Sequence, residues 1–176
     1  MKILSFQHKS VLDKILSTGE YKCDYISRTH KSSPLIYNKL RTDMNKQLKE
    51  KCINPIFGWY RVIDDEIVFN DETINRALQM VSFDHNNYIA LLLEIPESYV
   101  LLTDFYEFAD MRLFEEEHPT AVIELSYKIY DDEVQATFPV IKKEWLKKAY
   151  TIETKLEPNK YFHNLQNVYY LDKQIF

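Results

Sequence analysis

The stretch that decides the fold is Ile56-Phe57-Gly58-Trp59-Tyr60-Arg61-Val62-Ile63, a bulky segment that contains one of only two glycines among 176 residues. Its aromatic and β-branched side chains predict a strand. A glycine inside a strand packs no side chain and loses much conformational entropy on folding, so it marks a bulge or a close approach by backbone or ligand. Gly58 beside Trp59 and Tyr60 therefore predicts either a platform for a flat ligand or a tight contact in the core.

The scarcity of glycine excludes several nucleotide-binding and catalytic motifs. With Gly19 and Gly58 alone, the sequence contains no Walker A loop, no dinucleotide-binding G-x-G-x-x-G and no G-x-S-x-G elbow. The five histidines show no paired spacing, and we expect no metal site from them.

Bulk composition places the chain among ordinary globular proteins. It is 45% hydrophobic and 28% charged, and its length predicts a single domain over residues 1–176. Cys23 and Cys52 have no C-x-x-C spacing, which favours free thiols in a reducing compartment. The first residues turn polar too early for a signal peptide, and the longest apolar run is too short for a membrane span. We therefore predict a soluble cytoplasmic protein with no membrane partner.

Charge is divided unevenly along the chain, although the net charge is −5. Residues 1–63 carry twelve Lys/Arg and five Asp/Glu, whereas residues 64–133 carry three and eighteen. Residues 134–176 are again slightly basic. If the two basic ends lie together in the fold, they form a basic side that attracts an anionic ligand or nucleic acid, and the acidic segment 64–133 could instead face a basic protein partner. The alternative is that both charge groups are solvated surface. The overall acidic pI argues against nucleic acid as a partner.

Hydrophobic periodicity and turn residues predict an interleaved order of helices and strands. The predicted strands are 2–7, 56–63, 66–70, 88–95, 99–103, 134–141, 149–154 and 168–171. The predicted helices are 8–18, 34–51, 73–80, one from Asp104 that buries Phe105, Phe108, Ala109 and Leu113, and 119–130, with a helical turn at 143–148. Asp104 is the expected N-cap of its helix. This order indicates the α+β class, with a mixed or antiparallel sheet and packed helices.

Four stretches occur in an order that resembles a known family. They are Ile3-Leu4-Ser5-Phe6-Gln7, then Asn54-Pro55-Ile56-Phe57-Gly58-Trp59-Tyr60, then Leu93-Glu94-Ile95-Pro96 leading to Val100-Leu101-Leu102-Thr103-Asp104-Phe105, and finally Val134-Gln135-Ala136-Thr137-Phe138 before Lys142-Lys143-Glu144-Trp145. Over about residues 1–150 the chain resembles the bacterial and phage family called domain of unknown function 3841. It departs from that family at Phe57-Gly58, where Trp-Ala is more usual. The resemblance implies no established activity.

The candidate ligand-binding residues are Gln7, Arg28, Gly58, Tyr60, Gln135 and Thr137. A polar residue that ends the first strand, an aromatic residue in mid-chain and a polar residue on a late strand are similar to the pattern of mono-ADP-ribosyltransferases, an analogy of arrangement and not of motif. In this analogy Gln7 and Gln135 hold a ribose and Tyr60 stacks on nicotinamide. Separately, either Arg28 or Arg61 could hold a phosphate, although a surface arginine is the commoner explanation of each. Thr137 shares a strand face with Gln135.

The chemistry of these residues favours binding over cleavage. Glutamine can hydrogen-bond a ribose hydroxyl, but it supplies no negative charge to stabilise an oxocarbenium-like centre. We therefore predict a small ligand, with NAD, ADP-ribose or another nucleotide as the candidates, bound in a groove beside the Gly58-Trp59-Tyr60 strand. Two alternatives stay open: an ADP-ribosyltransferase-like or NAD-cleaving enzyme, and an acidic protein-interaction module of a phage or toxin system.

Overall fold

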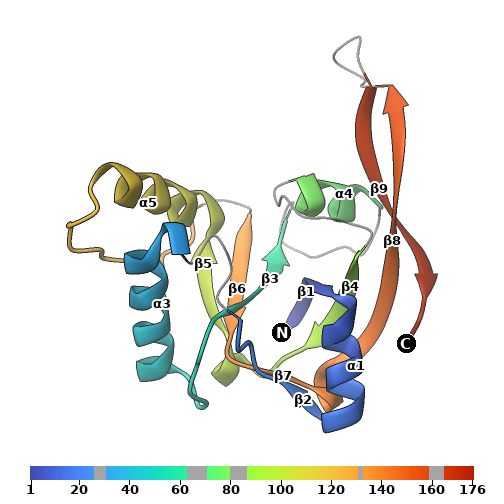
Figure 1. Ribbon diagram of the computed structural model, residues 1–176, viewed down its shortest axis with the longest axis horizontal. Coiled ribbons are helices and arrows are strands. Elements are labelled where there is room, and N and C mark those ends of the chain that lie inside the picture. Colours follow the sequence, from blue (N-terminus) through green and yellow to red (C-terminus); the bar gives the residue numbers. More distant parts are fainter. Residues whose placement is uncertain (26–30, 63–70, 80–86, 131–132, 159–164) are drawn as a thin grey trace.

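The computed structural model describes residues 1–25, 31–62, 71–79, 87–130, 133–158 and 165–176 (Figure 1). Its strands are β1 (Lys2–His8), β2 (Glu20–Tyr21), β3 (Ile56–Arg61), β4 (Tyr88–Glu94), β5 (Leu101–Asp104), β6 (Val134–Phe138), β7 (Ile141–Lys142), β8 (Leu146–Pro158) and β9 (Leu165–Gln174). Its helices are α1 (Lys9–Thr18), α3 (Pro34–Gln47), α4 (Asp71–Gln79) and α5 (Phe105–Glu117), with short 3₁₀ turns η2 (Glu97–Tyr99) and η3 (Lys143–Trp145).

The sheet has seven strands in the order β5-β6-β3-β1-β4-β8-β9, and β2 pairs with β7 in a separate two-stranded sheet. Each pairing among the described strands is antiparallel. The predicted α+β class is therefore confirmed, with the antiparallel alternative realised. β4 lies between β1 and β8, as its apolar residues on both faces predict.

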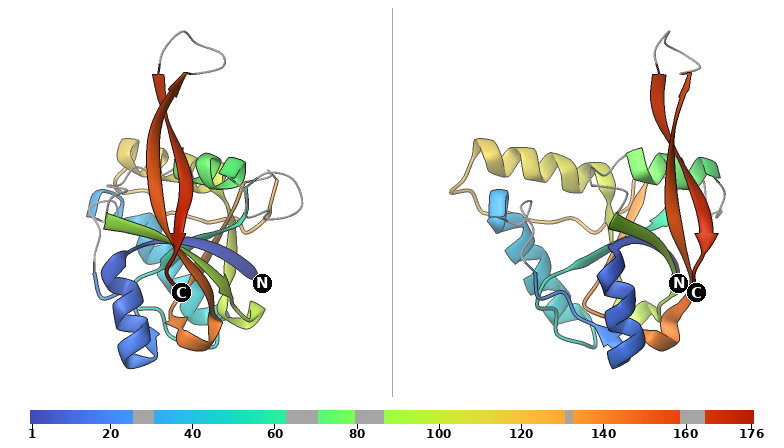
Figure 2. Two further views of the ribbon diagram at one scale, coloured as in Figure 1. Left: turned by 90° about the vertical axis from the view of Figure 1, so that its right-hand side faces the viewer. Right: turned by 45° about the vertical axis from the view of Figure 1, so that its right-hand side comes forward.

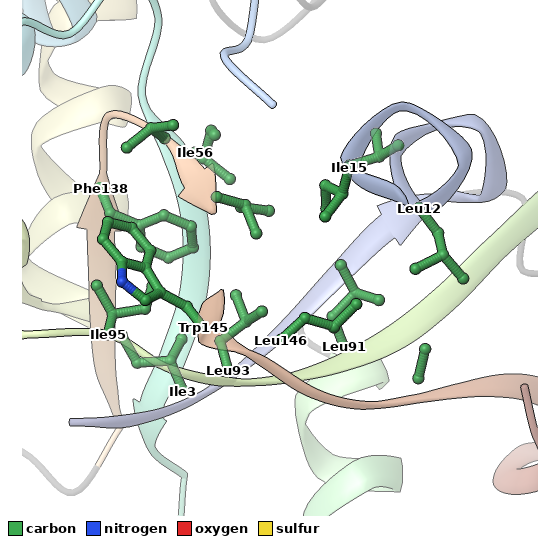
Figure 3. Close-up of a cluster of buried hydrophobic side chains, with 14 of the residues drawn as sticks. Ile3, Leu12, Ile15, Ile56, Leu91, Leu93, Ile95, Phe138, Trp145 and Leu146 are labelled. Atoms are coloured by element: carbon green, nitrogen blue, oxygen red, sulfur yellow. The ribbon is translucent and has the colours of Figure 1, made fainter. Parts of the chain in front are cut away.

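Helix α1 covers one face of the sheet and ends where the sequence predicts. His8 Nδ1 accepts a hydrogen bond from Ser10 N at its start, and Gly19 ends it with φ 88°, a left-handed conformation that glycine adopts without strain. Figure 3 shows Leu12 and Ile15 of α1 directed toward Leu91 and Leu146 of the sheet. Further along the same core lie Ile3, Ile95, Phe138 and Trp145.

The opposite face of the sheet is covered by α3, α4 and α5. Ile74, Ala77 and Leu78 of α4 pack with Leu4 and Trp59. Ile36, Leu40 and Met44 of α3 and Phe108 of α5 pack with Leu101 and the partly buried Phe57. Since Phe57 and Trp59 lie on one side of β3, the two clusters belong to the same face.

Helix α5 begins at its predicted N-cap. Asp104 Oδ1 accepts hydrogen bonds from the backbone N–H groups of Tyr106 and Glu107 at 3.1 and 3.2 Å, and its Oδ2 accepts one from Tyr130 N at 3.1 Å. All three bonds satisfy backbone donors, so Asp104 has the structural role that its position predicts.

Two predictions about the chain after Asp104 are wrong. Leu113 is 59% exposed, not buried. Residues 119–130 form no helix: Ile123, Leu125 and Tyr127 pack against the core cluster of α3 and α5, while Val122 before them and Glu124 between Ile123 and Leu125 are exposed. This alternation has the period of extended chain, and the β-branched residues suit it better than a helix. The predicted strand 66–70 lies outside the described residues.

The β8–β9 hairpin projects beyond the rest of the molecule (Figure 2). β8 pairs with β4 through residues 146–151 and with β9 through residues 150–158, so its second half belongs to a two-stranded ribbon. None of the helices in the described ranges is long and apolar enough to span a membrane.

Candidate functional site

The described surface contains a hollow of about 290 Å³ at the point where the chain enters β3. Its lining residues are Lys31, Pro34, Tyr37, Asn38, Arg41, Asn54 and Pro55. One wall is a single side of α3, because residues 34, 37, 38 and 41 follow the i, i+3, i+4, i+7 spacing of one helix face. The other wall is Asn54-Pro55, immediately before β3.

Tyr37 is held in place by two aromatic neighbours. Its ring meets Phe57 of β3 and Phe108 of α5 edge to face, with centroids 5.9 and 5.8 Å apart. Burial raises the pKa of the Tyr37 phenol, and the nearby Arg112 guanidinium opposes this only in part. The phenol is therefore neutral at physiological pH and presents an apolar ring with a polar tip.

The amides of the hollow are positioned by protein contacts. Arg41 Nη2 donates a hydrogen bond to Asn38 Oδ1 at 2.9 Å, which leaves further guanidinium donors for a ligand. Asn54 Nδ2 donates to Cys23 O at 3.3 Å, and Cys23 and Asn54 also form an isolated antiparallel bridge. This bridge ties the chain after β2 to the entrance of β3 and fixes the second wall.

The charge of the hollow is opposite to that of the whole protein. Its charged lining residues are Lys31 and Arg41, both cationic, and none of the described lining residues is acidic. The molecule as a whole carries a net charge of −5. Cations, amide groups and one phenol suit recognition of an anion such as a phosphate or carboxylate, which Arg holds through paired N–H donors.

The predicted site residues on β1 and β3 lie on the α1 face of the sheet. Gln7 Nε2 donates to Ser5 Oγ at 2.8 Å, and Ser5 Oγ donates to Phe57 O at 2.7 Å. This chain of bonds links β1 to β3, which share one registered pair, Leu4 with Trp59. Tyr60 is partly buried against the core on the same face.

Gly58 is a tight core contact, the second of the two readings that the sequence allows. A Cβ atom at Gly58 would lie 2.5 Å from Ile3 Cγ2 and 3.0 Å from Leu4 O. Trp59 is buried on the other face, where its ring meets Phe105 at 5.0 Å. The space in front of Gly58 is therefore filled by the protein itself.

The predicted site residues on β6 lie on the opposite face, under α3 and α5. Thr137 pairs with Phe57 of β3, and its Oγ1 donates to Leu101 O at 3.0 Å. Gln135 pairs with Trp59 on one side and with Thr103 of β5 on the other. Both Gln135 Oε1 and Thr103 Oγ1 are buried and form no hydrogen bond within the described part of the chain.

The structure thus places Gln7, Gly58 and Tyr60 on one face of the sheet, and Gln135 and Thr137 on the other; in the β1–β3 register Gln7 lies opposite Ile56 and not beside Tyr60. Arg28 lies outside the described residues. Thr137 is connected to the hollow through its strand partner Phe57, whose ring contacts Tyr37. The sequence does carry a signal for the hollow, the polar spacing of Tyr37, Asn38 and Arg41, but which segment faces that side of α3 depends on the tertiary fold.

Two acids of the segment 64–133 make structural contacts within the fold. Glu115 accepts hydrogen bonds from Leu35 N and Ile36 N at 2.7 and 2.9 Å, so it occupies the N-terminus of α3. Glu133, which immediately precedes β6, pairs with Arg76 at 2.8 Å. Both carboxylates are buried.

Comparison with known proteins adds no relative: the chain matches no family model, no curated protein and no solved structure. The resemblance to domain of unknown function 3841 therefore stays a prediction.

Proposed function

We propose that this protein binds a small anionic ligand in the hollow between α3 and the entrance of β3. The observation that carries the proposal is that Arg41 and Lys31 share a hollow whose described lining residues include no acid, on a protein of net negative charge. An anion gains from both cations there, and it meets repulsion over much of the remaining surface.

The ligand class follows from the size and the lining of the hollow. About 290 Å³ lies at the lower end of the range for small-molecule sites, so it holds a group the size of a ribose phosphate, not a whole dinucleotide. The amides of Asn38 and Asn54 suit hydroxyl or amide groups beside the anion, and the ring of Tyr37 offers an apolar wall. A mononucleotide, or one half of NAD or ADP-ribose, fits this description.

The positions of the predicted residues do not support a ligand groove beside Gly58-Trp59-Tyr60. They do not support ADP-ribosyl transfer or NAD cleavage either. Gln7 and Tyr60 are separated from Gln135 by the sheet, and Asp104 and Glu133 are engaged as a helix cap and in an ion pair. The proposed role is therefore binding. Two free cysteines, Cys23 and Cys52, agree with the proposed cytoplasmic location.

The proposal is tested by thermal melting with NAD, ADP-ribose, AMP, ATP, GTP and cyclic dinucleotides at millimolar concentration. A ligand at 100 times its Kd adds about 2.7 kcal/mol, which raises the Tm by several degrees in a domain of this size. Arg41→Ala is the informative variant, because Arg41 is exposed and its side chain hydrogen-bonds Asn38 within the same helix. Lys46→Ala is the matched control, since it removes one exposed cation of α3 that does not line the hollow.

Three outcomes are distinguishable. A shift that is lost in Arg41→Ala but kept in Lys46→Ala and in Gln7→Ala supports the hollow. A shift lost in Gln7→Ala but kept in Arg41→Ala assigns the ligand to the β1–β3 groove instead. The absence of any shift with these anions contradicts the nucleotide class.

A further inference from the structure

The outer side of α5 is an apolar surface exposed to solvent. Tyr106, Leu113 and Phe114 are 41%, 59% and 41% exposed, and their i, i+7, i+8 spacing places them on one side of the helix. Just beyond the helix, Val122 is 85% exposed. α5 lies at the periphery with α3 beneath it (Figures 1 and 2).

This exposed side is additional to the side that holds α5 in the fold. Phe108, Met111 and Glu115 already face the α3 cluster. A helix with apolar residues all round is normally buried on all sides. Among the described residues, His118 contacts the Phe114 ring at 4.6 Å and Phe105 contacts the Tyr106 ring at 5.3 Å. These contacts still leave Leu113 59% exposed and Phe114 41% exposed. Exposed apolar patches of this kind mark interaction sites.

The same side of α5 is strongly acidic. Asp110, Glu116 and Glu117 are exposed, and the last turn of the helix contains no basic residue. The C-terminal end of a helix carries a partial negative charge, so carboxylates there raise the energy of the free protein. A cation placed over this turn relieves both the carboxylate repulsion and the unfavourable helix dipole.

We propose that the outer side of α5 docks a cationic amphipathic segment of a partner protein, whose apolar side chains cover Leu113 and Phe114 while its Lys or Arg side chains meet Asp110, Glu116 and Glu117. Charge complementarity selects this occupant. A symmetric pairing of α5 with α5 in a second copy would set these acids against each other. Anionic membranes and nucleic acids are repelled for the same reason.

The test uses the full chain and a labelled 18-residue helical peptide of Leu and Lys with its leucines on one side, followed by fluorescence anisotropy. A peptide of equal composition with shuffled spacing is the probe control. The test variants are Leu113→Ser/Phe114→Ser and Glu116→Lys/Glu117→Lys. The matched controls are Leu156→Ser on β8, where Leu156 is 67% exposed, and Glu144→Lys in η3, where Glu144 is exposed.

Each test pair is expected to weaken binding at least tenfold, and each control less than twofold. The amphipathic peptide should also bind at least tenfold more tightly than the shuffled peptide, and part of its affinity should persist at 300 mM salt because apolar contacts are not screened. Equal binding of both peptides, or equal loss in the control variants, would overturn the proposal by showing general charge attraction. So would a dimer, measured by sedimentation, that Leu113→Ser/Phe114→Ser disperses.

Discussion

Ile3 occupies the space in front of Gly58: its Cγ2 atom lies 2.5 Å from the point where a Cβ of residue 58 would sit. Leu4 O lies 3.0 Å from the same point. One of these atoms belongs to the branch of a fully buried isoleucine and the other to backbone, so neither can move easily. The absence of a side chain at Gly58 therefore allows β1 and β3 to pack this closely.

Gly58→Ala should therefore destabilise the protein, by about 1–3 kcal/mol as for other overpacked cores. Chemical denaturation measures the change. A double-mutant cycle with Ile3→Ala makes the test specific, because the added methyl group then meets space instead of Cγ2. We expect Gly58→Ala to cost at least about 1 kcal/mol less in the Ile3→Ala background. Additive costs would show that the clash with Ile3 is not the cause.

The sequence predicts the structure least well where a side chain contacts a segment far away along the chain. Gly19, Pro34 and Asp104 mark helix ends by local rules, and the structure confirms all three. Nothing local indicates that Glu115 caps a helix that begins 81 residues earlier, at Pro34. The separation of Gln7 from Gln135 likewise depends on strand order, which periodicity does not determine.

Glu115→Ala should destabilise the protein by about 2–4 kcal/mol, because two backbone donors at a buried helix start lose their acceptor. Glu115→Gln keeps one acceptor oxygen and should cost less. Glu116→Ala is the matched control, since the neighbouring side chain is exposed and should change stability by less than about 0.5 kcal/mol. Hydrogen exchange locates the effect: the amides of Leu35 and Ile36 should lose protection first. Unchanged exchange there would contradict the cap.

Two buried threonines on neighbouring strands should respond oppositely to the same substitution. Thr103 Oγ1 has no hydrogen-bond partner in the described residues, whereas Thr137 Oγ1 donates to Leu101 O. Thr103→Val removes a buried hydroxyl that has no hydrogen bond to compensate its desolvation, so it should stabilise the fold by about 1 kcal/mol. Thr137→Val removes a hydrogen bond and should destabilise the fold by about 1 kcal/mol. The denaturation midpoints of the two variants, compared with that of the unmodified protein, measure these changes. A loss of stability in Thr103→Val would show that its hydroxyl has a partner in solution.

The buried carboxylate of Asp43 makes stability depend on pH. Burial alone would raise the pKa of Asp43, but hydrogen bonds from Lys39 Nζ and Tyr127 Oη, both 2.6 Å long, outweigh it and hold the pKa below its usual range. A carboxyl group whose pKa is lowered by folding stabilises the protein above its unfolded pKa of about 3.9. That contribution disappears as the pH falls from about 4 through the lower folded pKa.

Tyr127→Phe should cost about 1.5–3 kcal/mol at pH 7, because it removes a hydrogen bond to a charged acceptor. The cost should shrink below pH 4, where Asp43 takes up a proton and the bond becomes a weaker neutral one. The folded pKa of Asp43 should also rise in the variant, so that acid unfolding begins at a higher pH. Tyr130→Phe is the control, since the ring of Tyr130 is exposed. Urea denaturation from pH 2.5 to 7 checks this, and a cost for Tyr127→Phe that stays constant over that range would show that the Tyr127 hydroxyl does not act through the charge of Asp43.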